Sequence, residues 1–248
     1  RDGIDIQPKE FYERLAVDKV MPSTSQTTPE EFKVAYASLI EQGYDIISIH
    51  ISSKLSGTMD SAIQAKRAFP AANIELVDSL TTSMAMGFQV LSVARMANIG
   101  ASLAECKSVA LEAIKHTGVY FALNTLEFLH RGGRIGGAAA FMGTMLNLKP
   151  LLEVRDGRIE AVERVRTFNK TVDRLLDLVE AKLKDEKGPI RIAVIQANEE
   201  EKAELLLQRA IKRFSNTVVT DAVITAVSPV LGTHTGPGAL GVAYMSGM

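Results

Sequence analysis

Hydroxyl side chains and glycines gather in three short stretches of this 248-residue chain, and both are residue types that bind small anions. The stretches are PSTSQ (22–26), LSGT (55–58) and GTHTGPG (232–238). The second follows a predicted strand and opens a predicted helix, where backbone amides and the helix dipole attract a negative group. Because no cluster of lysines lies beside these hydroxyls, they favour a carboxylate over a polyphosphate. The alternative is that Ser, Thr and Gly only form turns and helix caps here.

The common sequence signatures of catalysis are absent. No Gly-Lys dipeptide exists, which excludes a P-loop, and neither G-x-S-x-G nor S-x-x-K occurs. Gly236, Gly238 and Gly241 match G-x-G-x-x-G, but a proline lies in the turn and an apolar strand follows it. A dinucleotide site needs a helix at that point, so the match does not predict one.

His234 is the most informative of the four histidines, because it lies among the glycines and hydroxyls of the last stretch. No two histidines have metal-ligand spacing, and the single cysteine, Cys106, supports neither a metal cluster nor an internal disulfide. We therefore predict no metal and no cofactor. Two interpretations of His234 stay open: a surface-loop residue, or a group at the mouth of a ligand site. A rival hypothesis is a small-molecule α/β enzyme, with His234 as general base and the glycine loop as a phosphate site.

Strands and helices that alternate along the chain must position these stretches. Thr28, Pro29 and two glutamates begin a helix that Gly43 ends. An isoleucine-rich strand then precedes the LSGT turn, a helix over 59–69 and a strand over 74–78. This order predicts a parallel sheet with helices on its faces. Further helices are expected over 82–97, 102–116, 170–185 and 199–214, and further strands over 190–196 and 217–226.

Two local signals sharpen this outline. Ser102 and Glu105 form a capping box at a helix start, and Asp156-Gly157 between alternating residues predicts a β-hairpin. We expect two α/β lobes, residues 1–125 and 126–248.

Composition excludes several classes of protein. Lys and Arg number 28 against 29 Asp and Glu, so no basic surface for nucleic acid is expected. No apolar run approaches the ~20 residues that cross a bilayer. One cysteine and no visible signal peptide predict a cytoplasmic location. The chain begins with Arg1, so we expect the natural N-terminus to lie upstream.

The motifs taken together resemble the DegV family, which includes the fatty-acid-binding subunits of bacterial fatty acid kinases. The stretches that carry the resemblance are PSTSQTTP (22–29), GYDIISIHISSKLSGT (43–58), VDS (77–79), HRGGRIGG (130–137), KPLLEVRDGRI (149–159), RVRT (164–167) and SPVLGTHTGPGALGVAYM (228–245). The resemblance implies two α/β lobes with a long-chain fatty acid in a tunnel between them. It also implies that Thr24 and Ser56 hold the carboxylate.

The predicted site extends from these two residues to the hydroxyls and glycines beside them. The fatty-acid-binding residues are expected to be Thr24, Ser25, Ser56, Gly57, Thr58, His234 and Thr235. Arg134 and Arg166 are expected to form a positive rim for a partner or a phosphate, the alternative being solvated surface. One apolar run has two interpretations, the lining of the tunnel or an ordinary core helix. The run contains Ala138–Ala140, Phe141, Met142, Met145 and Leu146.

Two features depart from the family pattern. The family begins with a strand and a TDS-like turn some tens of residues before RDGIDI, so the first lobe is expected to lack an early strand. Family members often have TTSQPS where this chain has STSQTT, but Thr24 and Ser25 remain.

The resemblance implies a carrier and not an enzyme. It would present the carboxylate to a separate kinase subunit that forms an acyl phosphate for phospholipid metabolism. A transient contact with a membrane surface is included among its expected interactions. A regulatory module for another carboxylate is the third hypothesis.

Overall fold

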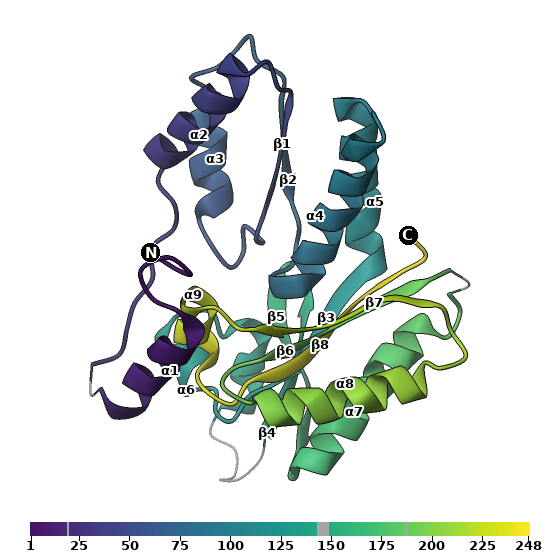
Figure 1. Cartoon of the computed structure of the whole chain (residues 1–248). Helices are drawn as coiled ribbons and strands as arrows, with labels where there is room; N and C mark the ends of the chain where they lie inside the picture. Colours follow the sequence, from purple (N-terminus) through teal and green to yellow (C-terminus); the bar gives the residue numbers. More distant parts are fainter. Residues whose placement is uncertain (19, 143–148, 187) are drawn as a thin grey trace. The chain divides into compact units, whose positions relative to one another are not determined.

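The computed structural model describes residues 1–18, 20–142, 149–186 and 188–248 (Figure 1). Contacts between Cα atoms divide the chain into two compact units. The two-stranded unit contains Ser25–Thr117 and Asp156–Arg158. The six-stranded unit contains Arg1–Thr24, Gly118–Arg155 and Ile159–Met248. Each unit is therefore built from separate segments of the chain, whereas the predicted lobes are each continuous.

The two-stranded unit is built on the parallel sheet that the sequence predicts. Strand β1 (Ile46–His50) pairs with β2 (Ile74–Asp78) in a register that places His50 beside Asp78. Its helices are α2 (Pro29–Glu41), α3 (Thr58–Lys66), α4 (Ser83–Asn98) and α5 (Leu103–His116). Apolar residues of α2 and α3 pack on one face of the sheet, and those of α4 and α5 pack on the other.

Capping side chains begin two of these helices, as the sequence predicts. The hydroxyl of Thr28 accepts a hydrogen bond from the amide of Glu31, whose carboxylate accepts one from the amide of Thr28. Ser102 and Glu105 form the same reciprocal pair at α5. Each pair satisfies two amides that the helix itself cannot bond.

The six-stranded unit has a mixed sheet with strand order β5-β4-β3-β8-β6-β7. The strands are β3 (Thr117–Ala122), β4 (Lys149–Arg155), β5 (Arg158–Val165), β6 (Ile190–Gln196), β7 (Val219–Ala226) and β8 (Leu240–Ser246). Strands β6 and β7 are parallel, whereas β3–β4 and β6–β8 are antiparallel. The helical elements are α1 (Pro8–Val17), α6 (Glu127–Arg131), the 3₁₀ helix η1 (Gly136–Phe141), α7 (Phe168–Leu183), α8 (Glu200–Arg213) and α9 (Pro229–Thr235).

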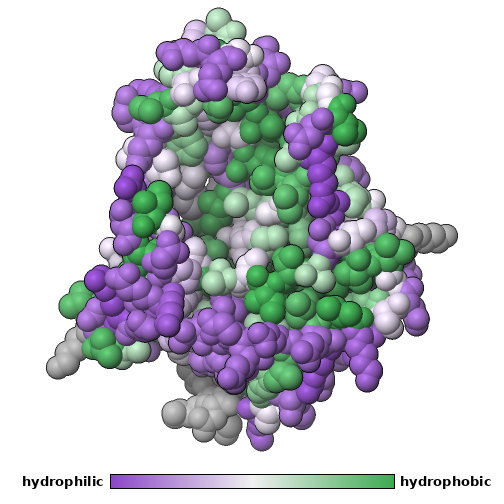
Figure 2. Space-filling model, viewed as in Figure 1, coloured by the Kyte–Doolittle hydropathy of each residue, from purple (hydrophilic) through white to green (hydrophobic). Residues whose placement is uncertain are grey.

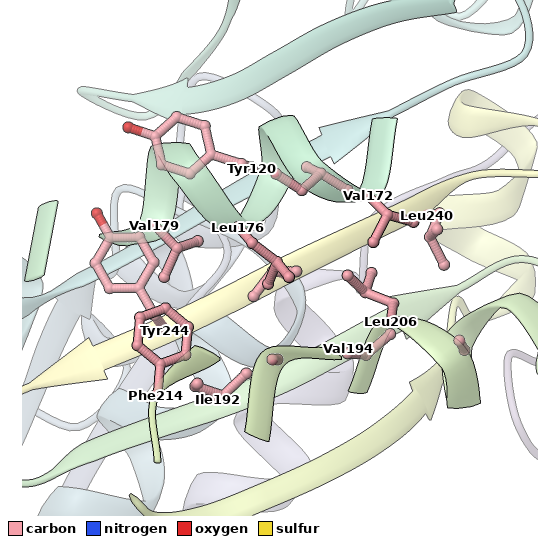
Figure 3. Close-up of a cluster of buried hydrophobic side chains, with 14 of the residues drawn as sticks. Tyr120, Val172, Leu176, Val179, Ile192, Val194, Leu206, Phe214, Leu240 and Tyr244 are labelled. Atoms are coloured by element: carbon pink, nitrogen blue, oxygen red, sulfur yellow. The ribbon is translucent and has the colours of Figure 1, made fainter. Parts of the chain in front are cut away.

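Helices α7 and α8 cover one face of this sheet and form the main core with it (Figure 3). Alternate strand residues such as Ile192 and Val194 point toward the helices, where Leu175 and Leu206 are fully buried. The core therefore follows the two-residue period of the strands and the apolar stripe of each helix.

Strand β7 forms one edge of the six-stranded sheet, and most of its residues are exposed. Apolar side chains gather on the surface over β7 (Figure 2), where Val223 and Ile224 are 38% and 37% exposed. The one acidic residue of the strand, Asp221, forms an ion pair with Arg191 of the neighbouring strand.

The predicted hairpin is confirmed at the turn between β4 and β5. Asp156 and Gly157 have φ angles of 50° and 80°, the left-handed conformation that Asp-Gly turns favour. The carbonyl of Gly157 accepts a hydrogen bond of 2.8 Å from the hydroxyl of Ser52. The side chain of Lys54 donates a second, 2.7 Å long, to the carbonyl of Asp156. These contacts explain why residues 156–158 belong to the two-stranded unit although their strands do not.

Among the residues that the structure describes, none of the helices combines the length and the apolar character needed to cross a membrane.

Candidate functional site

His234 lies in the last turn of a short helix, α9, and not in an open loop as the sequence analysis expects. Pro229 occupies the first helical position, which suits its fixed φ. Thr233 and Thr235 donate their hydroxyl protons to carbonyls one turn back, at 2.9 and 3.2 Å. Gly236 then ends the helix with a φ of 72°. The helix thus holds His234 at a fixed place, while the hydroxyl of Thr235, a predicted ligand contact, bonds within its own helix.

Two of the predicted site residues, Thr24 and His234, lie next to each other in the structure. The hydroxyl oxygen of Thr24 lies 2.9 Å from Nε2 of His234, and both side chains are half-buried. The other ring nitrogen, Nδ1, is buried and has no hydrogen-bond partner in the described part of the chain. A buried N–H without a partner is more costly than a free lone pair, so we assign the proton to Nε2. His234 then donates to Thr24, and the Thr24 hydroxyl proton is left for another acceptor.

Burial lowers the pKa of His234 below its ordinary value, and the positive charge of Arg134 lowers it further. The imidazole is therefore neutral near pH 7, which agrees with one protonated nitrogen. Arg134 is half-buried, and its guanidinium donates a hydrogen bond of 2.6 Å to the carbonyl of Gly132, the residue that ends α6. The predicted rim residue Arg134 is thus beside His234, within the same unit.

The LSGT turn forms the start of α3 in the two-stranded unit. The hydroxyls of Ser56 and Thr58 lie 2.8 Å apart, and the amide of Thr58 donates to the Ser56 oxygen at 3.3 Å. The amide of Ser56 itself donates to the carbonyl of Ser52. These hydrogen bonds hold the half-buried hydroxyl of Ser56 at the N-terminal end of a helix, where a negative group is favoured.

Gly57 lies beside the side chain of Gln26, a residue of the same unit. A Cβ atom on Gly57 would lie 2.9 Å from Nε2 of Gln26, closer than real Cβ atoms approach a neighbour. Glycine at this position therefore lets the Gln26 side chain lie over the turn. Ser25, another predicted contact, is exposed, and its side chain makes no hydrogen bond with a described residue.

Residues that were not predicted from the sequence hold the LSGT turn in place. Ser52 and Lys54 bind the hairpin turn at residues 156–157, more than 100 positions along the chain. The carboxylate of Asp78 accepts hydrogen bonds from the amides of Ser53 and Leu80. The Asp-Gly signal predicts the turn itself but not its partner, because a long-range contact has no local signature.

A buried polar chain lies at the end of β1 and includes His50, which the sequence places in a strand as a core or sheet residue. The Tyr36 hydroxyl donates to Ser48, whose hydroxyl lies 2.8 Å from Nε2 of His50. Phe32 packs edge-on against the His50 ring. Burial lowers the pKa of His50, and the negative charge of Asp78 opposes this shift. His50 is only 8% exposed, which supports the structural role that its place in a strand suggests.

Arg166 and the apolar run complete the list of predicted residues. Arg166, just after β5, is exposed and makes no ion pair with any described residue. In the apolar run, Ala138 is fully buried, Met142 is 43% exposed and Phe141 lies under the guanidinium of Arg164 at 4.2 Å. Met145 and Leu146 lie outside the described residues. Within the described part of the chain, no group of three His, Cys, Asp or Glu side chains is placed to bind a metal ion.

Known proteins resemble the chain over nearly its whole length. A family model described as an uncharacterised protein family, DegV, matches residues 1–247. A DegV domain-containing protein of Clostridium perfringens is 36% identical over 245 residues, which cover 97% of this chain and 85% of that protein.

Two solved structures agree with the fold. One, described as fatty acid binding of a DegV family protein from Thermus thermophilus, is 36% identical with a TM-score of 0.93, and covers 99% of this chain and 86% of its own. DegV of Bacillus subtilis, described as a fatty acid binding protein, is 33% identical with a TM-score of 0.86, and covers 100% and 86%. The mixed α/β architecture predicted from the sequence is therefore confirmed, and the chain belongs to the DegV family.

Proposed function

We propose that this protein binds a long-chain fatty acid and holds its carboxylate by hydrogen bonds from neutral hydroxyl groups. The observation that carries the proposal is the Thr24–His234 pair. With the ring proton assigned to Nε2, His234 donates to the Thr24 oxygen, and the Thr24 hydroxyl proton is available to an acceptor. The fatty acid binding described for the similar DegV structures supports a carboxylate as that acceptor.

Ser56 is the second proposed donor to the carboxylate. Its hydroxyl is fixed by Thr58 at the start of α3, and the helix dipole favours a negative charge there. Gly57 and Thr58 shape this turn, while Ser25 and Thr235 stay weaker candidates, because one is exposed and the other bonds within α9. A hydrogen bond to a charged group contributes about 1.5–3 kcal/mol, so two such donors give a carboxylate a strong preference over an ester.

We further propose that the protein acts as a carrier for a separate kinase. A kinase would transfer a phosphoryl group from ATP to the carboxylate, giving an acyl phosphate and ADP. Arg134, beside His234, and the exposed Arg166 are the proposed rim that meets the kinase or the acyl phosphate, since guanidinium groups bind phosphate oxygens in pairs. In the same proposal, the protein acts in the cytoplasm and supplies acyl phosphate for phospholipid metabolism. It also makes a transient contact with a membrane surface.

Extraction of the purified protein tests the binding part. The protein is extracted with organic solvent, and the extract is analysed by mass spectrometry; we expect fatty acids with long chains in near-stoichiometric amount. Delipidated protein should take up added oleate. If neither co-purified nor added fatty acid binds, the proposal is wrong.

Trapping of the product tests the carrier part. Loaded protein is incubated with ATP and hydroxylamine, which converts an acyl phosphate to a hydroxamate. We expect hydroxamate only when an extract that contains a kinase is added. Product or phosphate release by the isolated chain would instead support the rival enzyme that uses His234 as a base.

A further inference from the structure

Gly132 lies directly against the ring of His234. A Cβ atom on Gly132 would overlap Nδ1 of that ring and lie 2.9 Å from its Cε1. The backbone of Gly132 has a φ of −76°, which any residue adopts. Glycine is therefore needed here for space and not for backbone freedom.

The contact also explains why Nδ1 is buried without a partner. The edge of the ring that carries Nδ1 faces the α-carbon of Gly132, which offers neither a donor nor an acceptor. The opposite nitrogen, Nε2, is then the one that faces Thr24. The guanidinium of Arg134 bonds the Gly132 carbonyl at 2.6 Å, which helps to fix the backbone against which the ring rests.

Two other glycines join the same pair of segments. A Cβ on Gly236 would overlap the ring of Phe128, and one on Gly238 would overlap the side chain of Asn124. Asn124 also donates a hydrogen bond of 3.2 Å to the carbonyl of Pro237. The segment after β3 thus packs against α9 and the residues that follow it at three glycines, and Gly132 is the one that contacts His234.

We propose that Gly132 is a positioning residue: its missing side chain lets the His234 ring sit with Nδ1 against the α6 end and Nε2 toward Thr24. This inference deepens the proposed function. Only its fatty acid affinity experiment rests on that function, because the spectroscopic and stability experiments need no ligand. In this role Gly132 itself touches no ligand and acts through His234 and Thr24.

Nuclear magnetic resonance of the His234 ring tests the proposal without any ligand. In the wild type, the nitrogen shifts should identify Nδ1 as the unprotonated nitrogen, and the ring should titrate below the ordinary histidine pKa. In Gly132→Ala the ring must move away, so its resonances should change and its pKa should rise toward the ordinary value. Unchanged resonances and an unchanged midpoint in Gly132→Ala would overturn the proposal.

Gly133→Ala is the matched control, because Gly132 lacks space for a Cβ atom whereas Gly133 has a positive φ and open space around it. Gly133 has a φ of 70° and no atom within 4 Å of a built Cβ, so alanine strains the backbone but fills only open space. We expect Gly133→Ala to lower thermal stability and leave the His234 spectrum unchanged. A His234 shift in Gly133→Ala equal to that in Gly132→Ala would attribute the effect to the end of α6 and contradict the proposal.

A double-mutant cycle with His234→Ala covers the case in which Gly132→Ala folds poorly. If the added methyl acts through the ring, Gly132→Ala should lower the melting temperature much less in the His234→Ala background. Fatty acid affinity should fall about tenfold in either single variant and no further in the double variant, since one lost hydrogen bond is worth about that factor. Additive losses in stability and affinity would overturn the role of the ring. Absence of fatty acid binding in the wild type would refute the proposed function and leave the spectroscopic test intact.

Discussion

The hydroxyl oxygen of Thr24 lies 2.9 Å from Nε2 of His234, although the two residues are 210 positions apart. The pair joins a segment near the start of the chain to a helix near its end. Because Nδ1 is buried without a partner in the described residues, we assign the ring proton to Nε2, which makes His234 the donor of this hydrogen bond. With that assignment, the hydroxyl proton of Thr24 is left for the carboxylate that we propose as ligand.

Thr24→Val should weaken fatty acid binding by about tenfold, since valine keeps the shape and removes one hydrogen bond. It also leaves Nε2–H of His234 without its acceptor, so the melting temperature should fall as well. The measurement is a fluorescence titration with a fatty acid probe. Thr27→Val, at an exposed position in the same segment, should match the wild type. Equal affinities for Thr24→Val and Thr27→Val would remove Thr24 from the site.

Ser56→Ala should weaken binding by roughly ten- to a hundredfold, because a hydrogen bond to a charged group is worth about 1.5–3 kcal/mol. The apolar tail remains bound, so affinity is reduced and not abolished. Ser53→Ala is the control, since Ser53 is exposed in the same loop and contributes its amide to Asp78. Wild-type affinity in a well-folded Ser56→Ala would place the carboxylate elsewhere.

Stability should fall as the pH is lowered from about 6.5 toward 5, the ordinary range of histidine titration. The pKa values of His50 and His234 are both lowered by burial. The unfolded chain therefore binds protons that the folded chain does not, and the stability that is present above pH 6.5 is lost below it, by up to about 1.4 kcal/mol per pH unit for each group. Urea unfolding at several pH values measures this slope.

His50→Gln gives the control for that slope. It removes one of the two depressed groups, so stability should depend less steeply on pH between 6.5 and 5. A wild-type stability that is constant, or that rises, over this range would contradict the burial of both rings.

Leu206→Ala and Leu205→Ala form a matched pair on α8. Leu206 is fully buried in the core of the six-stranded unit, and Leu205 is 49% exposed. Leu206→Ala should lower the free energy of unfolding by about 2–5 kcal/mol through the cavity it leaves. Leu205→Ala should cost less than about 1 kcal/mol. Similar losses in urea unfolding would contradict the described packing of α8.

Arg166→Ala should slow phosphorylation of the bound fatty acid by a kinase extract at least tenfold and leave fatty acid affinity unchanged. Its side chain is exposed and makes no ion pair with a described residue, so removal leaves no charge unpaired within the chain. Arg158→Ala, exposed at the hairpin, is the control. Equal loss of affinity and of phosphorylation would place Arg166 in the pocket or the fold.

Local signals in the sequence predict local structure well. The capping residues Thr28 and Ser102 and the turn at Asp156-Gly157 all occur as expected, because each depends on neighbours within a few residues. The helix α9 was missed because its glycines and threonines favour a loop. Its Gly232 packs against Phe11 and Tyr12 of α1, a contact more than 200 positions away.

The sequence predicted the candidate residues by type but not how they pair. His234 and Thr24 were both candidates, yet only the structure shows that they bond to each other. The support from Gly132, Ser52 and Asp78 depends on contacts between distant segments, which one sequence does not reveal. The same reason explains why the hairpin turn at 156–158 lies with the two-stranded unit.

Fatty acid binding is tested most directly by the affinity of delipidated protein for a series of saturated fatty acids from eight to eighteen carbons. Each buried methylene contributes about 0.8 kcal/mol, so the dissociation constant should fall roughly fourfold per added carbon until the site is filled. The methyl ester of the best ligand should bind at least tenfold more weakly than the acid. Affinity that does not depend on chain length, or an ester that binds as well as its acid, would contradict the proposed binding of a long-chain fatty acid through its carboxylate.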